Sequence, residues 1–380
     1  MELFSQDTFS SAASPVPSEF RAAPRKAMKT NTVRVLSLSG GGLLGVISAA
    51  MLRRLEHLGR DAHGETYRLA HSFDLVGGTS TGAILATAVA LGLSADEMVD
   101  FYLRDAPRGL VRRRFFVPGV TEMFDTERLR SFFAKATKNR QIQSDHLATD
   151  LAIVVKSMTD GAPYCVTSVP LDPGASASVL GANVATGAFE LTDLLRASIA
   201  VPGLFAPQDL ALGKDGTVHA CVDGGLSPYH DPSELLFRYA RHCQMITGPV
   251  DTTRPIAMTA IGTGCARKGY PARSVLGFKS ATLSFAALRS MVTDGALHTQ
   301  AVMRHLSDDP TQHLNYRRLD MEICEKTFEL LGMSVDNVTL RQMRSFLSHR
   351  GKERLFEAAI LAAEAQISEP LAIRTRIPAA

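Results

Sequence analysis

Residues 33–45 read VRVLSLSGGGLLG, and residues 73–82 read FDLVGGTSTG. In each stretch a short apolar run ends in glycines, and an apolar pattern with helical spacing follows it. The first helical pattern runs from Leu43 to about Gly59, and the second runs from Thr81 to Leu91. Two successive units of strand, glycine turn and helix are typical of a parallel sheet. We therefore predict an α/β fold with a mostly parallel central sheet flanked by helices.

The rest of the chain continues this alternation. Further strands are expected at residues 151–156, 164–168, 218–222 and 255–261. Further helices are expected at residues 191–199, 232–242, 279–306 and 339–365, and residues 93–150 are expected to be mainly helical. Because no repeat or low-complexity linker follows residue 30, we expect one continuous domain over residues 31–330. A disordered basic tail, residues 1–30, would precede it, and a helical segment, residues 331–380, would complete or cap it.

The composition is that of an ordinary globular protein, with 45% apolar and 21% charged residues. A formal net charge of +3 is too small to indicate a partner that is a nucleic-acid polymer. The 5 cysteines are scattered and lack a C-x-x-C pair, which favours a reducing compartment over a disulfide framework or a zinc site. No apolar run suits a membrane span. We therefore expect a cytoplasmic protein.

The segment Gly78-Thr79-Ser80-Thr81-Gly82 fits the pattern G-x-S-x-G at the junction of a buried strand and an apolar helix. This is the setting of a nucleophile elbow, a sharp turn that exposes a serine hydroxyl while glycines let the neighbouring backbone pass close by. The start of the following helix favours negative charge at this point. We predict that Ser80 is a nucleophile, the alternative being a plain helix-capping serine.

The loop Gly40-Gly41-Gly42-Leu43-Leu44-Gly45 has two interpretations. As G-x-G-x-x-G it matches a dinucleotide-binding fingerprint, which also needs an acidic residue about 20 positions later, at the end of the next strand. Asp61 and Glu65 lie in a polar stretch instead, and Asp74 opens its strand. As an oxyanion loop, the glycine amides would act together with the amide of Thr81. The second interpretation accounts for both glycine loops, and we prefer it.

A nucleophilic serine needs a base. Asp223, in Val222-Asp223-Gly224-Gly225, ends an apolar strand before a glycine turn, where catalytic residues of open α/β sheets occur. We predict that Asp223 takes the proton of Ser80 directly, the alternative being an ordinary Asx turn. No histidine has a strong local signature, and a Ser-His-Asp esterase acting on small soluble esters stays open as an alternative. Its histidine would be one of His230, His298, His305 and His313.

Taken in order, the G-G-G-x-x-G loop, the G-x-S-x-G elbow and the Asp-Gly-Gly turn resemble the three signatures of patatin-like phospholipases. Residues 196–207, RASIAVPGLFAP, are similar to a further stretch typical of that family, and Ile261-Gly262-Thr263-Gly264 is similar to its Leu-Gly-Thr-Gly strand end. Two positions depart from the family pattern. Leu44 replaces a basic residue, and Asp231-Pro232 replaces Asn-Pro.

The resemblance implies a lipid acyl hydrolase of the phospholipase A type. Ser80 would be the nucleophile, Asp223 the only base, and the amides of Gly40, Gly41 and Gly42 the oxyanion hole. The family cleaves fatty acyl esters of membrane lipids, usually without a metal, and we expect no cofactor. Some cytosolic bacterial members act in antiviral defence and are switched on by a cyclic nucleotide. The implied partners are therefore a phospholipid membrane surface, approached transiently from the cytoplasm at the inner membrane, and a cyclic-nucleotide activator.

Basic residues cluster between residues 104 and 114 and are followed by Phe115 and Phe116. Several arginines together can bind phosphates, so this cluster is a candidate surface for an anionic regulator or membrane. The alternative is a solvated helix face beside two core aromatic residues. The sequence leaves open which of these holds, and also whether the chain forms a homo-oligomer. The cluster consists of Arg104, Arg108, Arg112, Arg113 and Arg114.

Overall fold

The computed structural model describes residues 32–105, 125–143, 145–169, 180–212, 216–242, 253–264, 272–278, 280–321 and 349–371. In this part of the chain the strands form one nine-stranded sheet, with the main order β5-β4-β3-β2-β1-β8-β9. The strands β3, β2, β1, β8 and β9 run parallel, β4 and β7 are antiparallel to β3, and β6 is antiparallel to β7. The predicted mostly parallel sheet is confirmed.

The strand bounds follow the apolar runs of the sequence. The central strands are β1 (Val33–Leu38), β2 (Leu75–Thr79), β3 (Asp150–Ser157), β8 (Ile256–Ile261) and β9 (Leu314–Leu319). The others are β4 (Pro163–Thr167), β5 (Asn183–Ala185), β6 (Gln208–Leu210) and β7 (His219–Asp223). Within β1, Leu36 and Leu38 face one hydrophobic core, whereas Val33 and Val35 face the other. This two-sided burial is the reason that the run is continuously apolar.

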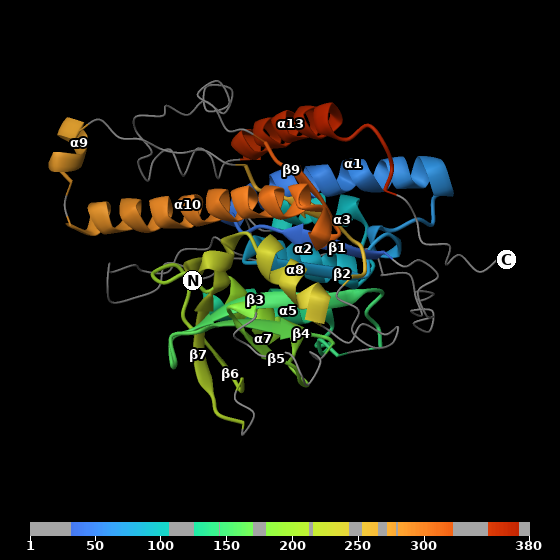
Figure 1. Cartoon of the computed structure of the whole chain (residues 1–380). Helices are drawn as coiled ribbons and strands as arrows, with labels where there is room; N and C mark the ends of the chain where they lie inside the picture. Colours follow the sequence, from blue (N-terminus) through green and yellow to red (C-terminus); the bar gives the residue numbers. More distant parts are fainter. Residues whose placement is uncertain are drawn as a thin grey trace, which may run out of the picture.

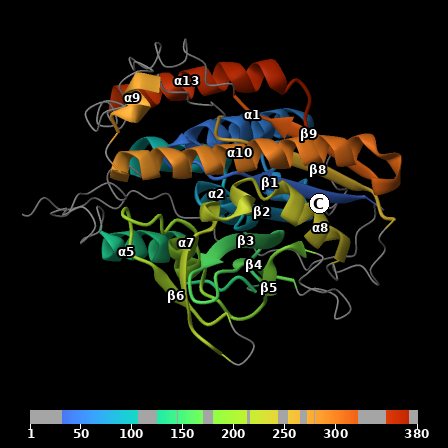
Figure 2. The same cartoon turned by 60° about the vertical axis from the view of Figure 1, so that its left-hand side comes forward.

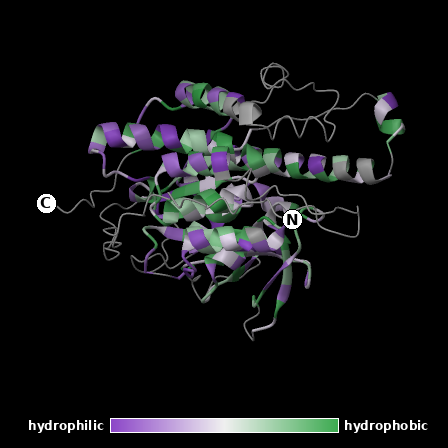
Figure 3. Ribbon diagram, turned by 180° about the vertical axis from the view of Figure 1, so that it is seen from behind, coloured by the Kyte–Doolittle hydropathy of each residue, from purple (hydrophilic) through white to green (hydrophobic). Residues whose placement is uncertain are grey.

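Helices cover both faces of the sheet (Figures 1 and 2). One core contains residues of α1 (Gly45–His63), α2 (Thr81–Ala90), α3 (Ala95–Asp100), α5 (Thr126–Thr137), α7 (Leu191–Ser198) and α13 (His349–Gln366). The other core contains residues of α8 (Ser233–His242) and the C-terminal part of α10 (Ser280–Asp308). The N-terminal half of α10 extends beyond the sheet, with α9 (Ala272–Leu276) at its tip. Figure 3 shows hydrophobic residues concentrated in the middle of the molecule.

The sequence missed some elements and misplaced others. β2 continues through Gly77 and Gly78 to Thr79, because these glycines pair in register with Ser37 and Leu38 of β1. We did not predict β5, β6 or β9. The helix expected from residue 339 is described only from His349, and residues 1–31 lie outside the described part of the chain. In the segment 93–150 the structure describes α3, a π-helix at Phe101–Asp105 and α5.

The C-terminal ends of β1, β2 and β7 lie close together and position the candidate site. β1 ends just before the first glycine loop, and β2, its parallel neighbour, ends just before Ser80. The C-terminal end of β3 extends past β2 and pairs with β7, which runs back toward the sheet. Asp223, the last residue of β7, is therefore opposite Val155, next to the strand position that pairs with Thr79.

Candidate active site

Ser80 occupies a sharp turn between β2 and α2. Its backbone has φ 55° and ψ −123°, a conformation that is uncommon for a residue with a side chain. The turn depends on close backbone approach at both flanking glycines. A Cβ at Gly78 would lie 2.2 Å from the carbonyl carbon of Gly82, and a Cβ at Gly82 would lie 2.1 Å from the carbonyl oxygen of Leu38. The G-x-S-x-G pattern is thus a steric requirement of this elbow.

The Ser80 hydroxyl donates a hydrogen bond to Asp223 Oδ2 at 2.7 Å. The other carboxylate oxygen of Asp223 accepts the backbone N–H of Gly225 at 2.6 Å. Ser80 and Asp223 are both buried, with 7% and 3% of their surfaces exposed. Burial raises the pKa of Asp223 to about 6, and the hydrogen bonds from Ser80 and Gly225 offset part of that effect. The carboxylate is therefore a stronger base than an exposed aspartate, yet mostly ionised at neutral pH.

The Asp-Gly-Gly turn has its own steric reason. A Cβ at Gly224 would lie 2.4 Å from the carbonyl oxygen of Val154, so the backbone after Asp223 passes directly over β3. The side chain of Asp223 also caps the short 3-10 turn at Gly224–Leu226. Asp223 therefore does both things that we considered: Oδ1 caps the turn by accepting the Gly225 N–H, and Oδ2 accepts the Ser80 hydroxyl.

Ser198 is a residue of the site that we did not predict. Its hydroxyl accepts the backbone N–H of Ser80 at 2.9 Å and donates to the carbonyl oxygen of Val154 at 2.8 Å. It thus ties the elbow to β3 through α7. The available signal was the family-like stretch at residues 196–207, in which Ser198 is the third residue.

The first glycine loop lies against the nucleophile. A Cβ at Gly40 would lie 3.4 Å from Ser80 Cβ. The Gly40 N–H donates to the carbonyl oxygen of His230 at 2.9 Å, so this amide, which we expected in the oxyanion hole, already has an acceptor. Within the described chain, the N–H groups of Gly41, Gly42 and Thr81 make no hydrogen bond. These three amides are the donors that the geometry leaves for an oxyanion.

The remaining motif residues support the loop. Leu43 and Leu44 belong to a 3-10 turn, and Gly45 begins α1. A Cβ at Gly45 would lie 2.3 Å from Thr81 Oγ1, so α1 starts in contact with the elbow. The hydroxyl of Thr81 is hydrogen-bonded to that of Tyr102, a fully buried residue of the π-helix, whose pKa burial raises. On the other side of the elbow, the Thr79 hydroxyl donates to the carbonyl oxygen of Tyr229 at 2.6 Å.

The histidines do not form a triad here. Because Ser80 and Asp223 are bonded directly, no imidazole stands between them. His298, His305 and His313 are exposed. The His230 ring lies between the two glycine turns, since Cβ atoms at Gly40 and Gly225 would both approach its Nδ1 within 3 Å. Burial lowers the pKa of His230 to about 4, which leaves the ring neutral at physiological pH.

Other expectations fall outside the site or outside the described residues. Asp61 and Glu65 are exposed at the far end of α1 and just beyond it, far from the glycine loop that a dinucleotide would occupy. Arg104 is exposed and pairs with Asp100 at 3.4 Å, while the rest of the arginine cluster, Phe115 and Phe116 lie outside the described part of the chain.

Among the described residues no helix is long and apolar enough to cross a membrane, and no group of three His, Cys, Asp or Glu residues could hold a metal.

Comparisons with known proteins identify the family of the chain. Residues 36–232, more than half of the chain, match the family model for patatin-like phospholipases. The chain belongs to the patatin-like phospholipase family. The predicted family is thereby confirmed.

Individual relatives are more distant. A cGAMP-activated phospholipase from Vibrio cholerae is 28% identical over 204 residues, which cover 51% of this chain and 52% of the relative. A cUMP-AMP-activated phospholipase from Escherichia coli is 40% identical over 83 residues, covering 22% of this chain and 24% of that one. The structure of VipD from Legionella pneumophila aligns with a TM-score of 0.34 and 11% identity over 89% of this chain and 68% of VipD. The chain therefore spans about half the length of the Vibrio relative.

Proposed function

We propose that the protein is a lipid acyl hydrolase of the phospholipase A type, which cleaves fatty acyl esters of membrane phospholipids with Ser80 and Asp223 as a catalytic dyad. The observation that carries this proposal is the 2.7 Å hydrogen bond between the Ser80 hydroxyl and the Asp223 carboxylate at a nucleophile elbow. Membership of the patatin-like phospholipase family supports the class of substrate.

In the first half of the reaction, Ser80 Oγ attacks the carbonyl carbon of the acyl ester, and its proton moves to Asp223 Oδ2. The amides of Gly41, Gly42 and Thr81 stabilise the oxyanion that forms on the carbonyl oxygen. When the tetrahedral intermediate collapses, the bond to the leaving alcohol breaks. Protonated Asp223 returns the proton to that oxygen, so a lysophospholipid leaves and the acyl group stays on Ser80.

In the second half, a water molecule attacks the acyl carbonyl and gives its proton to Asp223. The same amides hold the second oxyanion. Collapse breaks the bond to Ser80 Oγ, which recovers a proton from Asp223, and the fatty acid leaves. Because one carboxylate serves both halves, the dyad needs neither a histidine nor a metal, and the neutral His230 beside it competes for no proton at physiological pH.

Activation and location are extensions of this proposal. Two relatives carry names that state activation by a cyclic dinucleotide, and we propose that this chain responds to such an activator as part of antiviral defence. It would act in the cytoplasm and meet the inner membrane surface transiently. A homo-oligomer stays a prediction, which light scattering with and without the nucleotide would test.

The test is fatty acid release from vesicles of phosphatidylethanolamine and phosphatidylglycerol, measured by mass spectrometry. Wild-type protein is expected to release fatty acid and lysophospholipid in equal amounts, more strongly with cGAMP or cUMP-AMP present. Ser80→Ala is expected to release none, because the nucleophile is absent, while keeping the wild-type melting temperature. Equal release by Ser80→Ala and wild type would refute the proposal.

A further inference from the structure

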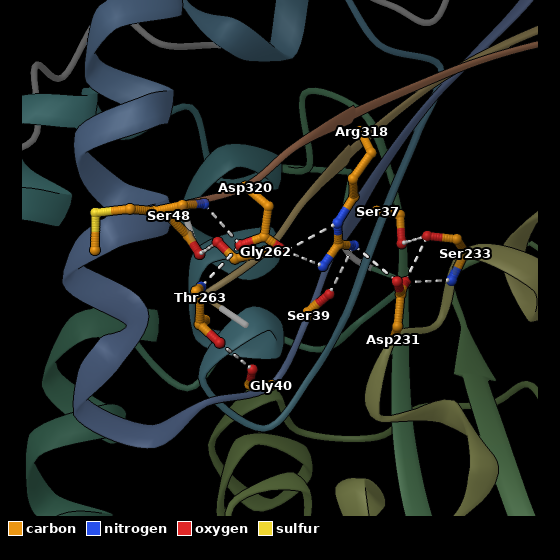
Figure 4. Close-up of polar contacts among 12 residues, drawn as sticks. Ser37, Ser39, Gly40, Ser48, Asp231, Ser233, Gly262, Thr263, Arg318 and Asp320 are labelled. Atoms are coloured by element: carbon orange, nitrogen blue, oxygen red, sulfur yellow. Dashed lines mark hydrogen bonds and ion pairs between the residues drawn. The ribbon is translucent and has the colours of Figure 1, made fainter. Parts of the chain in front are cut away.

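Beside the active site lies a buried ion cluster centred on Arg318 of β9. The Arg318 side chain is only 9% exposed and contacts Asp231 Oδ2 at 2.7 Å and Asp320 Oδ2 at 2.8 Å. It also donates a hydrogen bond to Ser39 Oγ at 3.1 Å, as Figure 4 shows. Burial disfavours the charged guanidinium, but the two carboxylates outweigh that effect and keep the pKa of Arg318 above its ordinary value. The cluster is therefore a fixed, charged unit in which every contact is directional.

Two contacts of Arg318 fix residues next to the Gly40 amide: one is with Ser39 and the other is with Asp231. Ser39 directly precedes Gly40 in the chain. Asp231 directly follows His230, whose carbonyl oxygen accepts the Gly40 N–H at 2.9 Å. Asp231 is in turn fixed by Ser233, whose backbone N–H and hydroxyl both donate to Asp231 Oδ1. The amide side of Gly40 is thus tied to Arg318 by two short routes.

The carbonyl side of Gly40 is tied to the same cluster by a third route. Asp320 Oδ1 accepts the backbone N–H of Gly264 at 2.8 Å. Gly264 directly follows Thr263, whose hydroxyl donates to the carbonyl oxygen of Gly40 at 2.7 Å. Figure 4 shows the bond between Thr263 and Gly40. Arg318 joins the three routes because it binds Asp231, Asp320 and Ser39 at once.

The orientation of Gly40 decides the direction of the next amide. The Gly40 carbonyl and the Gly41 N–H belong to one planar trans peptide, so they point in opposite directions. The bond from Thr263 therefore also aims the Gly41 N–H. A Cβ at Gly41 would lie 2.1 Å from Thr263 Oγ1, so any larger residue there would displace the hydroxyl that holds this peptide.

We propose that Arg318, together with Asp231 and Asp320, is a positioning unit that aims the Gly41 amide at the reacting carbonyl. This role rests on the proposed function, because it assigns Gly41 to the oxyanion hole. At position 231, where the family pattern has an asparagine, the aspartate of this chain forms an ion pair with the buried arginine. Arg318 touches no substrate and acts only through the glycine loop.

The test compares Arg318→Lys with Arg317→Lys. Arg317 is the adjacent residue of β9, is exposed and donates to the carbonyl oxygen of Gln366, so it is a matched control outside the cluster. Lysine keeps the charge, but its three donors share one nitrogen and lack the planar fork with which Arg318 binds the two carboxylates and Ser39. On a short soluble ester, Arg318→Lys is expected to lower kcat about tenfold or more, with KM within about twofold, because the loss is in transition-state stabilisation. Arg317→Lys is expected to match wild type.

Two further readouts separate positioning from general packing. A trifluoromethyl ketone, which forms an oxyanion on Ser80, is expected to inhibit Arg318→Lys less well than wild type, while the matching methyl ketone loses nothing. Hydrogen exchange in residues 36–45 is expected to be faster in Arg318→Lys than in Arg317→Lys. If Arg318→Lys does not fold, Asp320→Ala takes its place, because it removes the oxygen that accepts the Gly264 N–H and leaves Arg318 paired with Asp231.

Unchanged kcat and unchanged exchange in a folded variant would overturn the positioning role. So would an equal loss of both ketones, because that outcome reports a general defect. If wild-type protein cleaves no ester, the proposed function fails, while the exchange measurement still decides whether Arg318 holds the loop.

Discussion

At the scale of single residues, Ser80 and Asp223 are each held in a state that costs stability. A non-glycine residue in the backbone conformation of Ser80 costs about 1–3 kcal/mol and persists only where its surroundings enforce it. Burial makes ionisation of Asp223 less favourable than that of an exposed aspartate. Both costs fall on the two groups that share a hydrogen bond, and strain concentrated in this way is typical of a functional site.

The pH dependence of activity follows from Asp223. Because its pKa is raised to about 6, the carboxylate loses its charge, and its ability to accept the Ser80 proton, as the pH falls through that value. For a short soluble ester we expect kcat/KM to rise from pH 4.5 to pH 8 with a midpoint near 6. His230, with a pKa of about 4, adds no step in this range. A profile that is flat over this range, as a base with the ordinary aspartate pKa of 3.8 would nearly give, would contradict the assignment of a buried base.

At the scale of elements, the site depends on how closely β1, β2 and α2 pack. Gly82 is the position where this packing is tightest, with α2 lying directly on the end of β1. The contact is with backbone, which cannot move aside as a flexible side chain can. The distance between α2 and β1 at Gly82 therefore determines the position of Ser80.

Gly82→Ala is expected to lower the free energy of unfolding by about 1–3 kcal/mol and to reduce ester hydrolysis at least tenfold, because the new methyl group forces α2 away from Leu38. Thermal unfolding and a soluble-ester assay measure both effects. Gly295→Ala in α10 is the matched control. A Cβ there meets nothing within 4 Å, so stability should rise by up to about 1 kcal/mol with activity unchanged. Wild-type activity in Gly82→Ala would contradict the steric account of the elbow.

The elements that could be predicted are those whose pattern is local. β1, β2 and their helices carry apolar runs and glycine turns within a few residues, and Ser80 and Asp223 stand at the ends of such runs. β9 could not be found in this way. It reads LNYRRL, and an arginine in such a run indicates an exposed position. Arg318 is buried because it pairs with Asp231, which lies 87 residues earlier in the chain. The same holds for Ser198 and for the Gly40 amide, because their partners are set by tertiary contacts.

At the scale of the whole molecule, the C-terminal helix α13 packs on the α/β domain. It packs on α1, and its residues Ala359 and Ala363 are fully buried, as is Ile367, which directly follows the helix. Gln366 makes hydrogen bonds to the backbone of Asp320, next to the Arg318 cluster. In Figure 1 the helix lies over α1, on the outside of the layer that covers the sheet.

Ile367→Ala is expected to lower the free energy of unfolding by about 2–5 kcal/mol, because it opens a cavity at a fully buried position between α13 and the domain. Leu361→Ala is the control on the same helix. Its side chain is 68% exposed, so the change should stay within about 0.5 kcal/mol. Urea unfolding measures both. Equal stability of the two variants would show that α13 contributes little to the fold.

The central claim is that Ser80, activated directly by Asp223, carries the acyl group during ester cleavage. Rapid acid quench of the protein with an excess of a p-nitrophenyl fatty acyl ester, followed by peptide mass spectrometry, tests it most directly. We predict that the peptide containing Ser80 gains the mass of the acyl group within the first turnover, and that Asp223→Asn gains it at least a hundredfold more slowly, since removal of a catalytic base costs about 10²–10⁴ in rate. Acylation of another residue, or equally fast acylation of Asp223→Asn, would contradict the account.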